Sequence, residues 1–137
     1  MADLTVERVV SASPARVWRA WTDPELLASW FWPPRFLTTA EVDPRDGGAL
    51  RLASAPTGMG VSGVLGDVQP PRRFTTTWRW DGEDAETTVT VSLVEQRDGS
   101  TLVRVHHDGF RDERSVAEHV QGWTDCLARL PAVFVDR

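Results

Sequence analysis

Three histidines and an aspartate form the group in this sequence whose residue types could hold a metal ion or act as acid–base catalysts. His106, His107 and Asp108 are consecutive, and His119 follows in the next segment. Three such ligands would suffice for an open zinc site, but adjacent residues of a strand point to opposite faces of a sheet. His106 and His107 therefore do not share one ion, and His107 points inward. We expect no metal and no cofactor.

Other side chains of catalytic type are few. The chain has no lysine and no tyrosine, which excludes Schiff-base chemistry, lysine general bases and tyrosyl acids. Cys126 is expected at the edge of an apolar helix face as an inert thiol. Asp81 at a turn and Glu83 in an acidic loop are typical of turn capping and of a solvated surface. The sequence thus identifies no catalytic residue.

Seven tryptophans in 137 residues are the stronger chemical signal. Large flat apolar side chains line cores or pockets, and ligand pockets are typically aromatic with a few polar groups. We expect such a pocket, with histidines as its polar groups, although each aromatic residue taken singly could equally fill a core. The candidate ligand-binding residues are Trp30, Trp32, Phe36, Met59, Trp78, Trp80, His107, Phe110, His119, Trp123 and Leu127.

Local patterns predict the elements that position these residues. Residues 4–10 are typical of a strand. Ser13-Pro14 and Asp23-Pro24 each combine a helix N-cap with a proline at the first helical position, which predicts two short helices. Short β-runs separated by turn residues then indicate an antiparallel meander. Its expected strands are 38–42, 49–54, 59–68, 74–80, 86–95 and 101–107.

The last segment supplies a cover for this sheet. Alternation gives the sheet one apolar, aromatic face, which requires another layer against it. A helix of about five turns is predicted from an apolar stripe at spacings of four and three, with Pro131 kinking or ending it. Gly122 within it is interpreted as a point of close approach, because a helix-interior glycine costs about 1 kcal/mol. The stripe is Val116, Val120, Trp123, Leu127, Leu130 and Phe134.

The predicted fold class is therefore α+β. A curved antiparallel sheet of about six to seven strands wraps around a long C-terminal helix, and two short helices follow the first strand. The length fits one domain over residues 1–137. A net charge of −5 and a pI near 5.1 argue against nucleic acid as a partner.

Location and partners follow from further absences. No apolar stretch is long enough to span a membrane and no export leader is present, so we expect no membrane insertion. The single cysteine agrees with a reducing compartment, and we expect a cytoplasmic protein. The expected partner is a small hydrophobic molecule. A homodimer is left open because small symmetric dimers are common.

Short motifs extend nearly from end to end in a characteristic order. They are Val17-Trp18-Arg19-Ala20-Trp21-Thr22-Asp23-Pro24 with Leu27 and Trp30, Glu41-Val42-Asp43 with Arg45 and Gly47-Gly48, Gly63-Val64 with Pro70-Pro71-Arg72, Thr101 with His107, Gly109 and Phe110, and His119 with Gly122-Trp123, Leu127 and Leu130. In this order the chain resembles the helix-grip fold of the START-like superfamily, also called Bet v 1-like or SRPBCC. It is most similar to the branch named after the C-terminal domain of the Hsp90 ATPase activator.

This resemblance implies a pocket between the sheet and the long helix, in a family whose members mostly have no assigned reaction. The activator itself has a separate N-terminal domain that contacts the chaperone, and none precedes Met1 here, so we expect no transfer of that activity. The leading hypothesis is a module that binds a small hydrophobic or amphipathic ligand. One alternative is an enzyme of the cyclase, dehydratase or hydrolase type that uses the same pocket. A second is a co-chaperone-like interaction protein.

Overall fold

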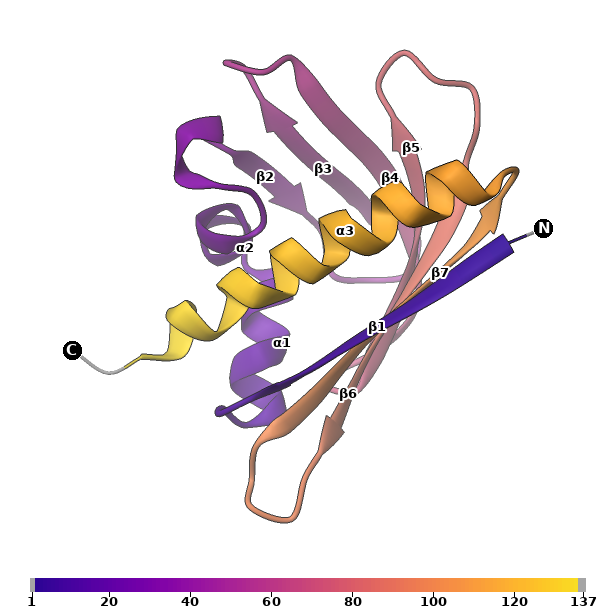
Figure 1. The fold of residues 1–137 in the computed structure, drawn as a ribbon. Helices are drawn as coiled ribbons and strands as arrows, with labels where there is room; N and C mark the ends of the chain where they lie inside the picture. The colour runs from indigo at the N-terminus through magenta and orange to yellow at the C-terminus, as the bar shows by residue number, and fades with distance from the viewer. Residues whose placement is uncertain (1, 136–137) are drawn as a thin grey trace.

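The alternating segments form one curved sheet of seven antiparallel strands in the computed structural model, which describes residues 2–135 (Figure 1). The spatial order is β1-β7-β6-β5-β4-β3-β2, so the first strand pairs with the last and β2 forms the other edge. The strands are β1 (Ala2–Val10), β2 (Thr39–Val42), β3 (Ala49–Ser54), β4 (Met59–Gln69), β5 (Arg73–Trp80), β6 (Thr87–Glu95) and β7 (Thr101–Phe110).

Two short helices follow β1, as the paired cap signals predict. In α1 (Pro14–Thr22) the Ser13 hydroxyl accepts the Arg16 backbone N–H. In α2 (Pro24–Trp30) the Asp23 carboxylate accepts the backbone N–H groups of Glu25 and Leu26. Both helices therefore begin where a side chain replaces the missing intrahelical bonds.

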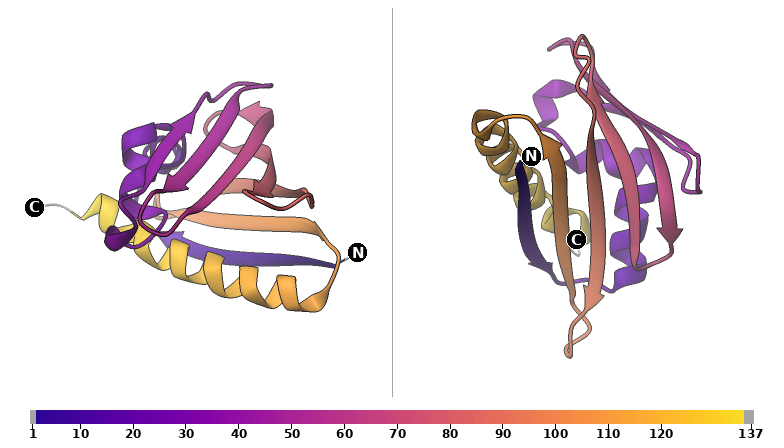
Figure 2. Two further views of the ribbon diagram at one scale, coloured as in Figure 1. Left: turned by 90° about the horizontal axis from the view of Figure 1, so that it is seen from above. Right: turned by 90° about the vertical axis from the view of Figure 1, so that its right-hand side faces the viewer.

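The long helix α3 (Glu113–Arg129) crosses the concave side of the sheet and runs alongside β1 (Figures 1 and 2). Apolar side chains of alternate strand residues are buried on the inner face of the sheet, among them Leu52, Phe74 and Val105. The architecture is the helix-grip α+β fold, which confirms the predicted fold class. No helix within residues 2–135 is long and apolar enough to cross a membrane.

The buried face of α3 is rotated relative to the predicted stripe. Val120 is 39% exposed, whereas Cys126 is only 5% exposed. The helix therefore turns the side that carries Cys126 toward the fold and leaves the side of Val120 in solvent. As expected, Pro131 ends the α-helix, and a 3₁₀ turn, η2 (Leu130–Phe134), follows.

Strand β7 continues three residues past its predicted end at His107. The register with β1 shifts at its far end, because Ala2 pairs with Phe110 whereas Asp3 pairs with Asp108. Gly109, at φ +95°, is the extra residue, in a conformation that a glycine adopts at little cost. The bulge restores the inward direction, and Phe110 is buried.

Candidate ligand-binding pocket

A cleft of about 700 Å³ lies between α3 and the sheet. One wall is α3, which contributes residues from Ser115 to Arg129, a distance of about 20 Å along a helix. The other wall combines the segment after α2 with the beginning of β4 and the end of β5. The lining includes exposed residues such as Met59, so the cleft opens to solvent.

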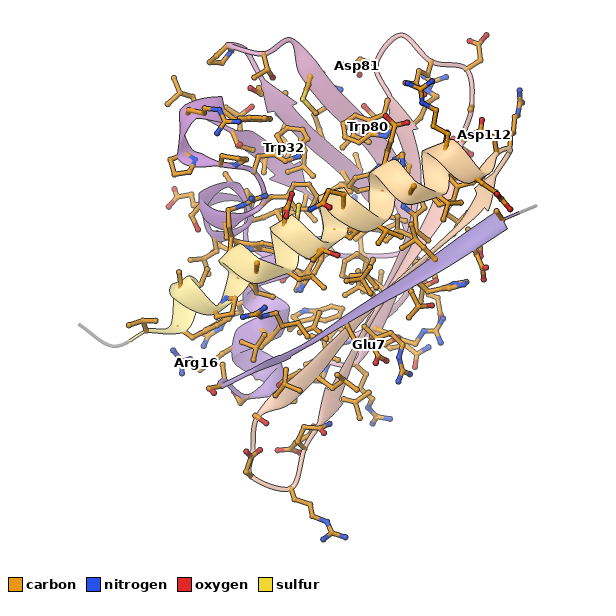
Figure 3. All side chains as sticks on the ribbon, in the orientation of Figure 1. Glu7, Arg16, Trp32, Trp80, Asp81 and Asp112 are labelled. Atoms are coloured by element: carbon orange, nitrogen blue, oxygen red, sulfur yellow. The ribbon has the colours of Figure 1, made fainter. Side chains whose placement is uncertain are left out.

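Aromatic rings line the wall that faces α3. The rings of Trp32 and Trp80 stack with centroids 6.2 Å apart and planes 21° from parallel. Figure 3 shows both indoles in the space between α3 and the strands. Deeper in the fold, Trp78 contacts Trp123 and Phe31 at centroid distances of 5.4 and 6.0 Å. The tryptophans thus surround the cleft without filling it.

His119 fixes the indole of Trp80. The Trp80 Nε1–H donates to His119 Nε2 at 3.0 Å. The other ring nitrogen, Nδ1, lies 2.8 Å from the Ser115 carbonyl oxygen, which can only accept a hydrogen bond. Nδ1 therefore carries the proton, and the imidazole is neutral with both nitrogens engaged.

His107 is held in the same way by Trp123. The Trp123 Nε1–H donates to His107 Nδ1 at 3.1 Å, so the proton is on Nε2, which donates to the Thr87 hydroxyl at 2.6 Å. That hydroxyl in turn donates to the Trp78 carbonyl oxygen at 3.3 Å. Burial, with smaller contributions from the other two histidines, lowers the pKa of His107 to about 3.

One end of the cleft carries an ion pair. The guanidinium of Arg51 donates to both carboxylate oxygens of Asp81, at 2.6 and 2.8 Å. The hydrogen bonds from Arg51 lower the pKa of Asp81, which is therefore ionised at neutral pH. A side chain at Gly60 would collide with this pair, since a Cβ there would lie 2.3 Å from the carboxylate of Asp81. Gly60 thus makes room for the pair at the mouth.

The other end is closed by Arg129 and Cys126. The Arg129 guanidinium donates to the carbonyl oxygens of Trp30 and Phe31, at 3.0 and 2.6 Å. The Cys126 thiol donates to the same Phe31 oxygen at 2.9 Å, and burial raises its pKa to about 12. A thiol with so high a pKa is a poor nucleophile. These contacts attach the last turn of α3 to the end of α2.

Metal ligation has no geometric support in the part of the chain that the structure describes. Residues 2–135 contain no group of three or more histidine, cysteine or acidic side chains that could hold an ion. His106 faces away from His107 and lies 2.9 Å from the carboxylate of Asp3.

The sequence matches one protein family, described as activator of Hsp90 ATPase homolog 1-like protein, over residues 11–135. The chain belongs to this family. The match covers both cap signals, the meander and α3, so the membership rests on nearly the whole domain. No curated protein matches the sequence.

Solved structures similar to this family member include protein CV1439 from Chromobacterium violaceum, with a TM-score of 0.82 and 28% identity over 99% of this chain and 100% of that one. CalU16 from Micromonospora echinospora has a TM-score of 0.74 and 27% identity, over 96% of this chain and 74% of that one. An HSP90 activator from Plasmodium falciparum has a TM-score of 0.78 and 20% identity, over 97% and 96% of the two chains. The last likeness shows the fold alone.

Most of the predicted site residues of this family member lie at the cleft. Those that line it are Trp32, Phe36, Met59, Trp78, Trp80, His119 and Trp123. The others, Trp30, His107, Phe110 and Leu127, are buried in the core and not at the wall. Trp30, for example, donates its indole N–H to the Ala20 carbonyl oxygen at 2.9 Å and joins α2 to α1. Sequence alternation identifies inward positions but does not distinguish a core position from a pocket wall.

Several lining residues were not on the predicted list. Arg35 and Arg129 belong to these, as do Cys126 and Gly122. The interpretation of Gly122 as a point of close approach is wrong, because a Cβ placed there would meet no atom within 4 Å. The sequence did carry a signal for Gly122. A glycine inside a helix lowers the stability of that helix, so its presence there indicates some other requirement.

Proposed function

We propose that this protein binds a small apolar or amphipathic molecule in the cleft between α3 and the sheet. The observation that carries the proposal is the cleft itself, whose volume is about 700 Å³. Pockets for drug-sized ligands measure roughly 300–1,000 Å³ and are lined mainly by apolar and aromatic groups. The aromatic lining residues are Phe31, Trp32, Phe36, Trp78, Trp80 and Trp123.

The histidines and the cysteine thiol support binding rather than a reaction. Both ring nitrogens of His119, at the cleft, and of His107, in the core, are engaged in hydrogen bonds, so neither ring presents a free lone pair to a ligand. The Cys126 thiol has a raised pKa and bonds to a carbonyl oxygen. We also propose a cytoplasmic location, in agreement with a single, buried, unpaired cysteine.

The test is a thermal-shift screen of hydrophobic metabolites, with tryptophan emission as the second readout. A ligand at 100 times its Kd stabilises a protein by about 2.7 kcal/mol, which raises the Tm of a domain of this size by several degrees. We expect hits that also quench the indole emission, because Trp32 and Trp80 lie at the cleft.

Two arginine substitutions on β4 test whether the compounds that raise the Tm bind in the cleft. Met59→Arg places a charge at the cleft, whereas Val64→Arg places the same charge at an exposed position outside it. We expect Met59→Arg to abolish the shifts and Val64→Arg to retain them. The proposal fails if no compound shifts the Tm, or if both variants respond like the wild type.

A further inference from the structure

Gly122 lies in the middle of α3 and has no role there that the fold explains. Its backbone is ordinary helix, without a positive φ. An added Cβ would touch nothing within 4 Å, so no neighbouring chain requires a glycine. Glycine is among the least favourable residues for a helix interior. An alanine at this position would stabilise α3 more than the glycine does, and yet the position carries no side chain.

The bare position belongs to the wall of the cleft. His119 and Cys126 lie one turn before and one turn after Gly122 on the same side of α3, and all three line the cleft. His119 fills its part of the wall by bonding to Trp80, and Cys126 fills its part by bonding to Phe31. Between them the helix backbone itself is the wall.

Two indoles line the wall of the cleft opposite this stretch of backbone. Trp32 and Trp80 line the opposite wall with their rings stacked, and the bond to His119 fixes the Trp80 indole one turn away from Gly122. Planar unsaturated rings pack favourably against indole faces. A stretch of helix without a side chain, in a cleft lined by indoles, leaves a space that suits a ring system.

We propose that Gly122 determines which ligands the cleft accepts, by admitting a flat, unsaturated ring system between the α3 backbone and the indoles of Trp32 and Trp80. This inference rests on the proposed function and names the chemical class of its ligand. A side chain at position 122 would project into that space, so the size of the residue there sets the thickness of the ring system that fits.

The test measures two probes on four proteins. Nile red is a neutral, flat, polycyclic dye whose binding is followed by fluorescence, and decanol is a flexible chain whose binding is followed by calorimetry. The proteins are the wild type, Gly122→Ala, Gly122→Leu and the control Ala117→Leu, which introduces the same leucine side chain at an exposed position of α3 outside the cleft.

We expect Gly122→Leu to weaken Nile red binding at least about tenfold, since even one methylene in a pocket changes affinity by that order. The affinity of Gly122→Leu for decanol should fall much less, and Ala117→Leu should bind both probes like the wild type. Gly122→Ala should raise the Tm of the free protein by about 3 °C, because alanine is the better helix former.

Each other outcome overturns the inference in a distinguishable way. A wild type that binds neither probe overturns both the inference and the proposed function. Unchanged Nile red binding by Gly122→Leu overturns the inference and leaves the proposed function standing. If Gly122→Leu loses as much affinity for decanol as for Nile red, the assignment of a flat ring system as the ligand class is overturned. A lowered Tm for Gly122→Ala would show that the fold itself needs the glycine, which also overturns the inference.

Discussion

At the scale of single residues, the two inward histidines orient tryptophans. Each accepts an indole N–H on one ring nitrogen and donates from the other, His119 to a carbonyl oxygen and His107 to a hydroxyl. Both arrangements require the neutral imidazole, because a doubly protonated ring has no lone pair to accept the indole proton. The orientation of the Trp123 indole is thereby coupled to the protonation of His107.

This coupling predicts an acid-sensitive stability that originates at His107. Its pKa is about 3 in the fold against about 6.5 in an unfolded chain, so the unfolded state takes up the proton first as the pH falls. The part of the free energy of unfolding that depends on a neutral His107 is fully present above about pH 6.5, and it is lost progressively as the pH falls toward 3. Between about pH 7.5 and pH 5 we expect the free energy of unfolding to fall by about 2 kcal/mol from this residue.

Denaturant titration at both pH values measures the effect. His107→Gln keeps an acceptor for Trp123 and a donor for Thr87 but does not titrate, so its stability should fall by about 2 kcal/mol less than that of the wild type. Val105→Ala is the control, since it weakens the same strand without removing a titrating group. Equal losses in the wild type and His107→Gln would contradict the assignment.

The inward direction of His107 could be predicted from strand alternation, but its partners could not. Trp123 and Thr87 lie on α3 and β6, and Trp80 and His119 are 39 positions apart in the chain. Such pairs meet only after the sheet has curved and α3 has settled across it. Sequence patterns report periodicity within an element, and they carry no measure of the distance between elements.

At the scale of elements, the indole of Trp123 packs α3 onto the core. This side chain is 3% exposed and contacts Trp21, Phe31 and Trp78 at centroid distances of 6.3, 5.6 and 5.4 Å. We expect Trp123→Ala to lower the free energy of unfolding by about 3–5 kcal/mol, the usual range for emptying a buried aromatic site.

Val120→Ala is the matched control on the same helix. Because Val120 is 39% exposed, its truncation should cost less than about 1 kcal/mol. Urea titration of both variants checks the orientation of α3. A loss below about 1 kcal/mol for Trp123→Ala, or a loss above 2 kcal/mol for Val120→Ala, would mean that another face is buried.

Element boundaries were predictable where the signal is local. Ser13 and Asp23 mark the starts of α1 and α2 through contacts within a few residues. The end of β7 was not predictable, because it depends on pairing with β1 at the opposite end of the sequence. The rotation of α3 has a similar origin. Leu127 fits the stripe, but Cys126 is buried because of its contact with Phe31, which is distant in sequence.

At the scale of the whole molecule, the family name raises the question of a chaperone partner. A docking surface of the co-chaperone type needs a sizeable exposed apolar patch. On the outer face of the described sheet, Val9 and Val94 flank the half-buried Leu102 across β1, β7 and β6. A row of three aliphatic side chains is small for such a surface.

We therefore expect no stimulation of ATP hydrolysis when this protein is added to Hsp90, and no co-purification of the two. A coupled ATPase assay checks this, with an established activator as the positive control. A dose-dependent increase that Val94→Arg abolishes would contradict the expectation and place the contact on the outer face of the sheet.

The pairing of β1 with β7 also determines when folding can finish. Residues from Ala2 to Val10 find their partners between Thr101 and Phe110, and α3 is made after both. At about 5–20 residues per second, a ribosome needs about 5–20 s to synthesise the 90 residues between these strands. During that interval β1 emerges without its neighbour, and contacts so distant in sequence slow folding further. In the cell, the nascent chain is thus most exposed to aggregation before α3 is released from the exit tunnel.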